Sequence, residues 1–221
     1  VFTTPADALA QMTDRTAVLA IQSGEPGPIA QTLAGVETAL CDLAARRSGL
    51  PLWRWLRQVG LAPADADEAG ESRLVPDRLV PGRLIPYASG INPDEAGLTA
   101  SRCHTEGFRA FKLKTGFGQD RDLANLAEIR TAIGPALPLM IDANQAWSLD
   151  EALAIAPRLA PFDLQWLEEP LRADRPWAEW RQLQAQCPVP LAAGENLAGE
   201  VAFRGALDSG VLAVLQPDLA K

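Results

Sequence analysis

The sequence predicts an α/β fold in which parallel strands alternate with helices, and the arrangement that fits best is a TIM-type (β/α) barrel. Two observations carry this prediction. From residue 83 onward, short apolar runs alternate with longer stretches whose apolar residues recur at helical spacing. Acidic residues end three of these runs about every 25 residues, which would place them around one rim of a barrel. An open doubly wound sheet is disfavoured because no G-x-G-x-x-G segment follows the first run.

The first part of the chain, residues 1–57, is expected to be helical. A helical pattern begins at Pro5, and residues 28–47 carry apolar side chains three or four positions apart. The segment Gly49-Leu-Pro51 is a stop signal, because glycine ends helices and proline cannot continue them. Residues 58–82 are rich in proline, glycine and polar residues and are expected to form a connecting loop.

The second part, residues 83–221, is expected to be the barrel domain, with about six strands visible. Helices are expected at 122–133, 149–159 and 176–186, and Ser148 is a suitable N-cap for the second of these. The expected strands are the apolar runs at residues 84–88, 110–114, 138–142, 164–168, 190–195 and 212–216.

Composition and charge exclude several classes of protein. Of the 221 residues, 48% are hydrophobic and 22% charged, which excludes disordered, collagen-like and disulfide-scaffold chains. The 28 acidic residues outnumber the 20 basic ones, and the net charge of −8 repels phosphate backbones and anionic lipids. No apolar run approaches the roughly 18–20 residues of a membrane span. We therefore expect neither nucleic acid nor a membrane as a partner.

The cysteine and histidine content narrows the chemistry further. The three cysteines (Cys41, Cys103 and Cys187) are odd in number, far apart and without a C-x-x-C pair, so we expect reduced thiols and a cytoplasmic protein. With His104 as the one histidine of the sequence, no zinc site of histidines and cysteines can be assembled.

Three acidic residues are the candidate metal ligands: Asp142, Glu168 and Glu195, each at the end of an apolar run. Carboxylates gathered at one rim repel one another and need a cation. Oxygen ligands suit Mg²⁺, which keeps positions open for water or substrate. One Mg²⁺ ion at this rim would polarise a substrate carboxylate and stabilise the enediolate formed when the neighbouring proton is removed.

Two lysines are the candidate groups that act on that proton. Lys112 and Lys114 stand two positions apart, so both side chains leave the same face of their strand. A divalent ion nearby lowers the pKa of an ammonium group and makes a lysine usable as a base. Lys114 is closer to the carboxyl end of the strand and is the candidate base, while Lys112 would meet the substrate carboxylate.

Five short segments carry a family resemblance: F-K-L-K at 111–114, I-D-A-N at 141–144, W-L-E-E-P at 166–170, A-G-E-N at 193–196 and Q-P-D-L-A-K at 216–221. Together they resemble the motifs of the enolase superfamily, and the mandelate racemase/muconate lactonizing enzyme-like subgroup that includes acid-sugar dehydratases is the most similar. The resemblance implies a modified barrel, preceded by the end of an α+β capping domain at residues 1–57, and we expect a homo-oligomer.

The resemblance also assigns a role to Asp218, but the histidine that this role requires does not follow it in the sequence. Asp218 matches an aspartate of the sixth strand, which in the mandelate racemase-like subgroup pairs with a histidine of the seventh, but no histidine follows it. His104 is expected in the helix before the second strand, outside the barrel. The superfamily barrel has eight strands, so we expect the natural chain to continue past Lys221 with that histidine and to carry a strand region before Val1.

The resemblance therefore implies an Mg²⁺-dependent lyase or isomerase that removes a proton next to a carboxylate, and dehydration of a sugar acid is the leading hypothesis. Lys114 or an Asp218–histidine pair would be the base, and Lys221 is a further candidate. Racemisation, epimerisation and cycloisomerisation are alternatives within the superfamily, and a non-catalytic metal-binding relative is an alternative outside catalysis. Taken singly, the acids could instead cap helices or form salt bridges.

Overall fold

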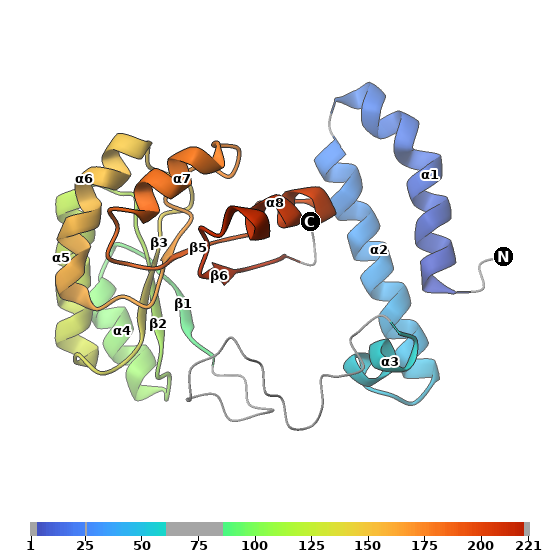
Figure 1. Cartoon of the computed structure of the whole chain (residues 1–221). Helices are drawn as coiled ribbons and strands as arrows, with labels where there is room; N and C mark the ends of the chain where they lie inside the picture. The colour runs from blue at the N-terminus through green and yellow to red at the C-terminus, as the bar shows by residue number, and fades with distance from the viewer. Residues whose placement is uncertain (1–3, 25, 61–85, 219–221) are drawn as a thin grey trace. The chain divides into compact units, whose positions relative to one another are not determined.

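The computed structural model describes residues 4–24, 26–60 and 86–218 (Figure 1). These residues form two compact units: one of three helices, and one in which a six-stranded sheet alternates with five α-helices. Among the described residues, no helix combines the length and the apolar character needed to cross a bilayer.

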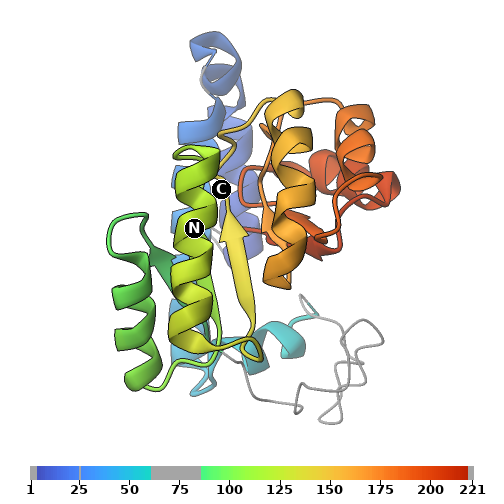
Figure 2. The ribbon, with the colours of Figure 1, turned by 90° about the vertical axis from the view of Figure 1, so that its left-hand side faces the viewer.

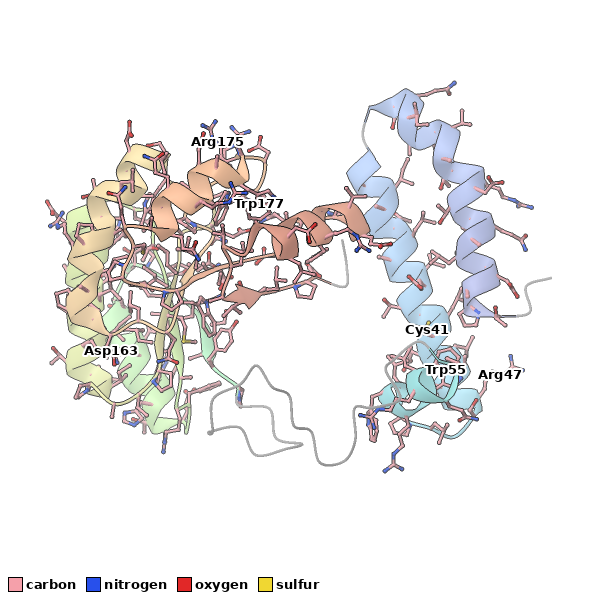
Figure 3. The ribbon with its side chains drawn as sticks, in the orientation of Figure 1. Cys41, Arg47, Trp55, Asp163, Arg175 and Trp177 are labelled. Atoms are coloured by element: carbon pink, nitrogen blue, oxygen red, sulfur yellow. The ribbon has the colours of Figure 1, made fainter. Side chains whose placement is uncertain are left out.

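The first unit confirms the helices expected in the N-terminal part of the chain. Its helices are α1 (Pro5–Ser23), α2 (Pro26–Arg47) and α3 (Leu52–Gln58). A small core of Cys41, Ala45 and Trp55 joins α2 to α3, and Figure 3 shows the first and last of these side by side. The loop expected at 58–82 lies outside the described residues from position 61 onward.

The second unit contains the predicted parallel sheet. Each strand pairs in parallel with the next along the chain, in the order β1 to β6. In the register, Asp142 is opposite both Lys114 on one side and Glu168 on the other. The strands are β1 (Ala88–Ile91), β2 (Phe111–Lys114), β3 (Leu139–Asp142), β4 (Leu167–Glu168), β5 (Leu191–Ala193) and β6 (Val214–Leu215).

A helix follows each of the first five strands, as the (β/α) barrel prediction requires. Figure 2 shows α4, α5 and α6 side by side over the outer face of the sheet. A 3₁₀ turn at Ala160–Phe162 follows α6. The helices are α4 (Ala96–Thr105), α5 (Gln119–Ile133), α6 (Leu149–Leu159), α7 (Trp177–Gln184) and α8 (Gly199–Ser209).

Several boundaries differ from the sequence prediction by one to four residues, and those of the first strand and of α5 are two of them. The first strand is Ala88–Ile91, so of the expected 84–88 segment only Ala88 belongs to it, and residues 84 and 85 lie outside the described residues. Helix α5 begins at Gln119 instead of residue 122, because Gly118 has a φ of 113° and ends the preceding loop at that point. The polar residues Gln119 and Asp120 carry no apolar periodicity, so the pattern did not reveal this first turn.

Side chains alternate between the two faces of the sheet, and the two faces differ in character. Phe111 and Leu113 of β2, with Ile141 and Leu167 of the next two strands, belong to the apolar core shared with the helices. The intervening residues leave the opposite face of the sheet, because successive strand side chains point in opposite directions. That second face carries the candidate residues Lys112, Lys114, Asp142 and Glu168.

Helix α6 begins with a capping box, which supports a stability prediction. The Ser148 hydroxyl accepts a hydrogen bond from the Glu151 backbone N–H (3.3 Å), and the Glu151 carboxylate accepts one from the Ser148 backbone N–H (2.8 Å). We expect Ser148→Ala to lower the free energy of unfolding by about 1 kcal/mol, measured by urea denaturation. The control is Ser101→Ala on the exposed face of α4, where alanine should not destabilise the helix. Equal losses in both variants would contradict a specific cap.

A candidate active site at the carboxyl ends of the strands

The two lysines of β2 contact the two acidic residues that end β3 and β4. Lys112 Nζ lies 2.8 Å from both carboxylate oxygens of Glu168 and 3.4 Å from Asp142 Oδ2. Lys114 Nζ donates to Asp142 Oδ2 (2.6 Å) and to Asn144 Oδ1 (2.7 Å). Asp142, Glu168 and Lys112 are buried, whereas Lys114 is half-buried. The structure therefore brings four of the predicted site residues into direct contact.

Burial and charge act in opposite directions on the groups of this cluster. Burial by itself would raise the pKa of Asp142, but hydrogen bonds from Lys114 and from the Asn144 backbone N–H, together with the charges of both lysines, hold that pKa below its usual value. Burial would lower the pKa of Lys112, yet its hydrogen bonds to Glu168 and the negative charges of Glu168 and Asp142 raise it overall. Both groups are thus held in their charged forms.

Two further side chains contact Glu168 and were not singled out from the sequence. Trp166 Nε1 donates to Glu168 Oε2 (3.1 Å), and Gln216 Nε2 donates to the same oxygen (2.8 Å). Trp166 stands two residues before Glu168 and therefore shares its face of the strand. That spacing was a usable signal for Trp166. Gln216 directly follows β6; in the sequence it ends an apolar run and begins the Q-P-D-L-A-K segment, but neither feature predicts the contact with Glu168.

A second carboxylate, Glu169, is buried directly beside Glu168. It has a left-handed backbone with φ of 41°, and both of its carboxylate oxygens accept hydrogen bonds from Asn196 Nδ2 at 2.9 Å. Burial raises the pKa of Glu169; the Asn196 hydrogen bonds act against this, and the charges of Glu195, Asp142 and Glu168 add to the rise. The charge of Glu195 therefore acts on the same cluster as the other two predicted ligands.

The turn after Lys114 is held by a buried aspartate. Asp122, in the first turn of α5, accepts hydrogen bonds from the backbone N–H groups of Gly116 (2.9 Å) and Phe117 (3.3 Å). Burial raises the pKa of Asp122, and these two hydrogen bonds act to lower it. Because Lys114 ends the strand that leads into this turn, Asp122 constrains the position of the candidate base.

The remaining predicted residues lie in or after other elements of the chain. Glu195 follows the last residue of β5 by two positions, and Asp218 follows the last residue of β6 by three. His104 lies in α4, as expected, with its ring 6.2 Å from that of Phe111 in a T-shaped arrangement. Lys221 lies outside the described residues.

The donor chemistry of this cluster fits a hard divalent cation. Asp142, Glu168, Glu169 and Glu195 supply only oxygen donors, and these four carboxyl groups outnumber the two ammonium groups among them by two. Lys112 already places one positive charge between Asp142 and Glu168. Within the described parts of the chain, no group of three or more acidic, histidine or cysteine side chains lies close enough together to coordinate a metal ion as the side chains stand.

Comparison with known protein families and structures gives one consistent family. The family described as Enolase C-terminal domain-like matches residues 96–221. A crystal structure of mandelate racemase/muconate lactonizing enzyme from Bordetella bronchiseptica RB50 is 51% identical, with a TM-score of 0.85, over 100% of this chain and 55% of that one. A racemase from Streptomyces coelicolor A3(2) with bound magnesium is 27% identical, with a TM-score of 0.76, over 100% of this chain and 61% of that one.

Curated relatives have two kinds of activity in their names, cycloisomerase and dehydratase. D-galactarolactone cycloisomerase of Agrobacterium fabrum is 41% identical over 57% of this chain and 33% of the relative. The 3,6-anhydro-alpha-L-galactonate cycloisomerase of Streptomyces coelicolor is 31% identical over 90% of this chain and 50% of the relative. L-talarate/galactarate dehydratase of Salmonella typhimurium is 30% identical over 79% of this chain and 40% of the relative. The chain thus spans half or less of the length of these relatives.

Proposed function

This chain belongs to the enolase C-terminal domain-like family, and on that premise we propose that it removes the proton next to the carboxylate of a sugar acid. The observation that carries the proposal is the pairing of Lys114 Nζ with the buried Asp142 Oδ2 at 2.6 Å. It places a potential base beside a potential metal ligand at the carboxyl end of a parallel sheet, where barrel enzymes have their catalytic groups.

We propose Asp142, Glu168 and Glu195 as the residues that hold Mg²⁺. All three are carboxylates at or just past the ends of adjacent parallel strands, and Asp142 and Glu168 are directly opposite in the register. Mg²⁺, when bound, supplies positive charge that acidifies the C–H bond next to the substrate carboxylate. Asp142 and Glu168 now pair with the Lys112 ammonium group. If these carboxylates held the cation instead, Lys112 would be free to meet the substrate carboxylate.

Lys114 is the proposed base. Its Nζ accepts the proton, and the electron pair of the broken C–H bond moves toward the substrate carboxylate. In a dehydration, a hydroxyl group then leaves the neighbouring carbon and, with the abstracted proton, makes up the water that is lost. An Asp218–histidine pair remains the alternative base, because the family resemblance pairs the sixth-strand aspartate with a histidine of the seventh strand.

Dehydration of a sugar acid is the leading proposal, and cycloisomerisation is the second candidate. The name of the Salmonella typhimurium relative supports the first. The names of the Agrobacterium fabrum and Streptomyces coelicolor relatives support the second. Both reactions begin by removing a proton next to a carbonyl carbon, so the same lysine and the same cation serve either.

The test is proton exchange with solvent deuterium. The protein, with Mg²⁺, is incubated in D₂O with a panel of aldonic acids, aldaric acids and their lactones, and ¹H NMR follows the signal of the proton next to the carboxylate. We expect that signal to disappear for at least one compound. A 2-oxo acid as product, with loss of water, identifies a dehydratase, whereas an isomer of the substrate that differs in mass only by the incorporated deuterium identifies a cycloisomerase or racemase. No exchange across the panel, with Mg²⁺ binding intact, would instead support a non-catalytic metal-binding relative.

A further inference from the structure

The two oxygens of the Glu168 carboxylate differ sharply in their surroundings. Oε2 accepts hydrogen bonds from Lys112 Nζ (2.8 Å), Trp166 Nε1 (3.1 Å) and Gln216 Nε2 (2.8 Å). Oε1 accepts a hydrogen bond from one donor among the described residues, Lys112 Nζ at 2.8 Å. A carboxylate oxygen has about two lone-pair sites, so three donors saturate Oε2 while Oε1 keeps acceptor capacity.

We infer that Trp166 and Gln216 are positioning residues that hold Glu168 by Oε2 and reserve Oε1 for the cation. This inference rests on the proposed function, because it assumes that Glu168 is a metal ligand. Departure of the Lys112 ammonium group would leave Oε1 without its protein donor, whereas Oε2 would keep two. The carboxylate would therefore keep its orientation during the exchange of lysine for metal. Hydrogen bonds of this kind around a ligand tune metal affinity.

The tryptophan is itself held in place by an aromatic contact. The ring of Tyr87 meets that of Trp166 edge-on, with centroids 5.9 Å apart and planes at 82°. Lys112 Nζ lies 5.5 Å from the centroid of the same tyrosine ring. The indole N–H is therefore aimed at Glu168 by packing between the start of β1 and β4, and Trp166 does not depend on the metal for its orientation.

The glutamine reaches Glu168 from two strands away, across β5. A glycine makes this approach possible: a Cβ atom at Gly194, whose φ is 142°, would stand 2.7 Å from the backbone nitrogen of Gln216. That nitrogen donates to the carbonyl oxygen of Ala193 (3.1 Å). The amide orientation of Gln216 is set by its partner, because only the NH₂ group can face a carboxylate. Its Oε1 is buried and has no hydrogen-bond partner among the described residues.

The test measures Mg²⁺ affinity of the full-length protein by titration calorimetry, together with the thermal unfolding of the metal-free form. Trp166→Phe and Gln216→Met each remove one donor while keeping the bulk of the side chain. We expect each to weaken Mg²⁺ binding by about tenfold to a hundredfold. The combined variant should lose more than either single one.

Matched controls separate positioning from general packing. Trp180→Phe removes a buried indole whose Nε1 has no hydrogen-bond partner among the described residues, and Gln184→Met removes an amide bonded to the carbonyl oxygen of Val211 (3.1 Å). These variants should unfold at lower temperature but bind Mg²⁺ as the wild type does. Equal affinity in Trp166→Phe, Gln216→Met and wild type would overturn the inference and leave the proposed function standing. Equal losses in the controls would also overturn it, and a wild-type protein that binds no Mg²⁺ would overturn the proposed function itself.

Discussion

Lys114→Met is expected to slow the exchange of the substrate proton by about 10²- to 10⁴-fold while Mg²⁺ binding is retained. The methionine keeps the length of the side chain but has no group that can accept a proton. Asp142 would lose its 2.6 Å partner yet keep the Asn144 backbone N–H at 2.9 Å and Lys112 at 3.4 Å. Its carboxylate should therefore stay in place. Deuterium exchange and calorimetric titration of Mg²⁺, measured on the same preparation, check both parts.

Lys114→Arg is the companion variant, because it keeps the positive charge but cannot act as a base near neutral pH. We expect it to lose exchange as the methionine variant does. Exchange at the wild-type rate in both variants would move the base to the pair of Asp218 and its histidine partner. Exchange restored by arginine alone would mean that Lys114 contributes charge and not proton transfer. Loss of Mg²⁺ binding together with exchange would make Lys114 a structural residue.

Asp142→Asn is expected to weaken Mg²⁺ binding by at least about tenfold, since one of three proposed carboxylate ligands loses its charge. The surroundings of Asp142 sharpen this expectation. Its Oδ1 accepts the Asn144 backbone N–H, so an asparagine that keeps this bond turns its NH₂ group toward Lys114 Nζ. Two donors would then face each other, and Lys114 should be displaced as well. Proton exchange should therefore fall along with metal affinity.

The control for this variant is Asp120→Asn, which removes the same charge from an exposed position paired with Arg158 at 2.8 Å. Its Mg²⁺ affinity should equal that of the wild type, because an exposed pair is screened and lies outside the cluster. Unchanged Mg²⁺ binding in Asp142→Asn would show that this aspartate serves the lysines as a salt-bridge partner and is not a ligand.

The sequence by itself determined the order of the elements and the end of the sheet at which the polar residues gather. Regular alternation of apolar runs and helical stretches predicts parallel strands that pair in chain order. Side-chain alternation with a period of two then puts Lys112 and Lys114 on one face. Asp142 and Glu168 fall at equivalent positions of successive units, so local periodicity places them at the same end of the sheet as these lysines. The start of the first strand was misplaced, because a run of apolar residues does not reveal where pairing begins.

Only the tertiary structure decided which donors surround each oxygen of the site. Gln216 meets Glu168 across 48 residues of sequence, and this contact depends on the missing side chain of Gly194, where a Cβ atom would stand 2.7 Å from the backbone nitrogen of Gln216. Lys112 bridges Asp142 and Glu168 because buried carboxylates take the nearest cation, whereas periodicity alone assigned it no partner. The bond between Asn196 and the buried Glu169 likewise joins the loops after β4 and β5. Such contacts arise from backbone geometry between distant segments, and no local pattern of residues encodes that geometry.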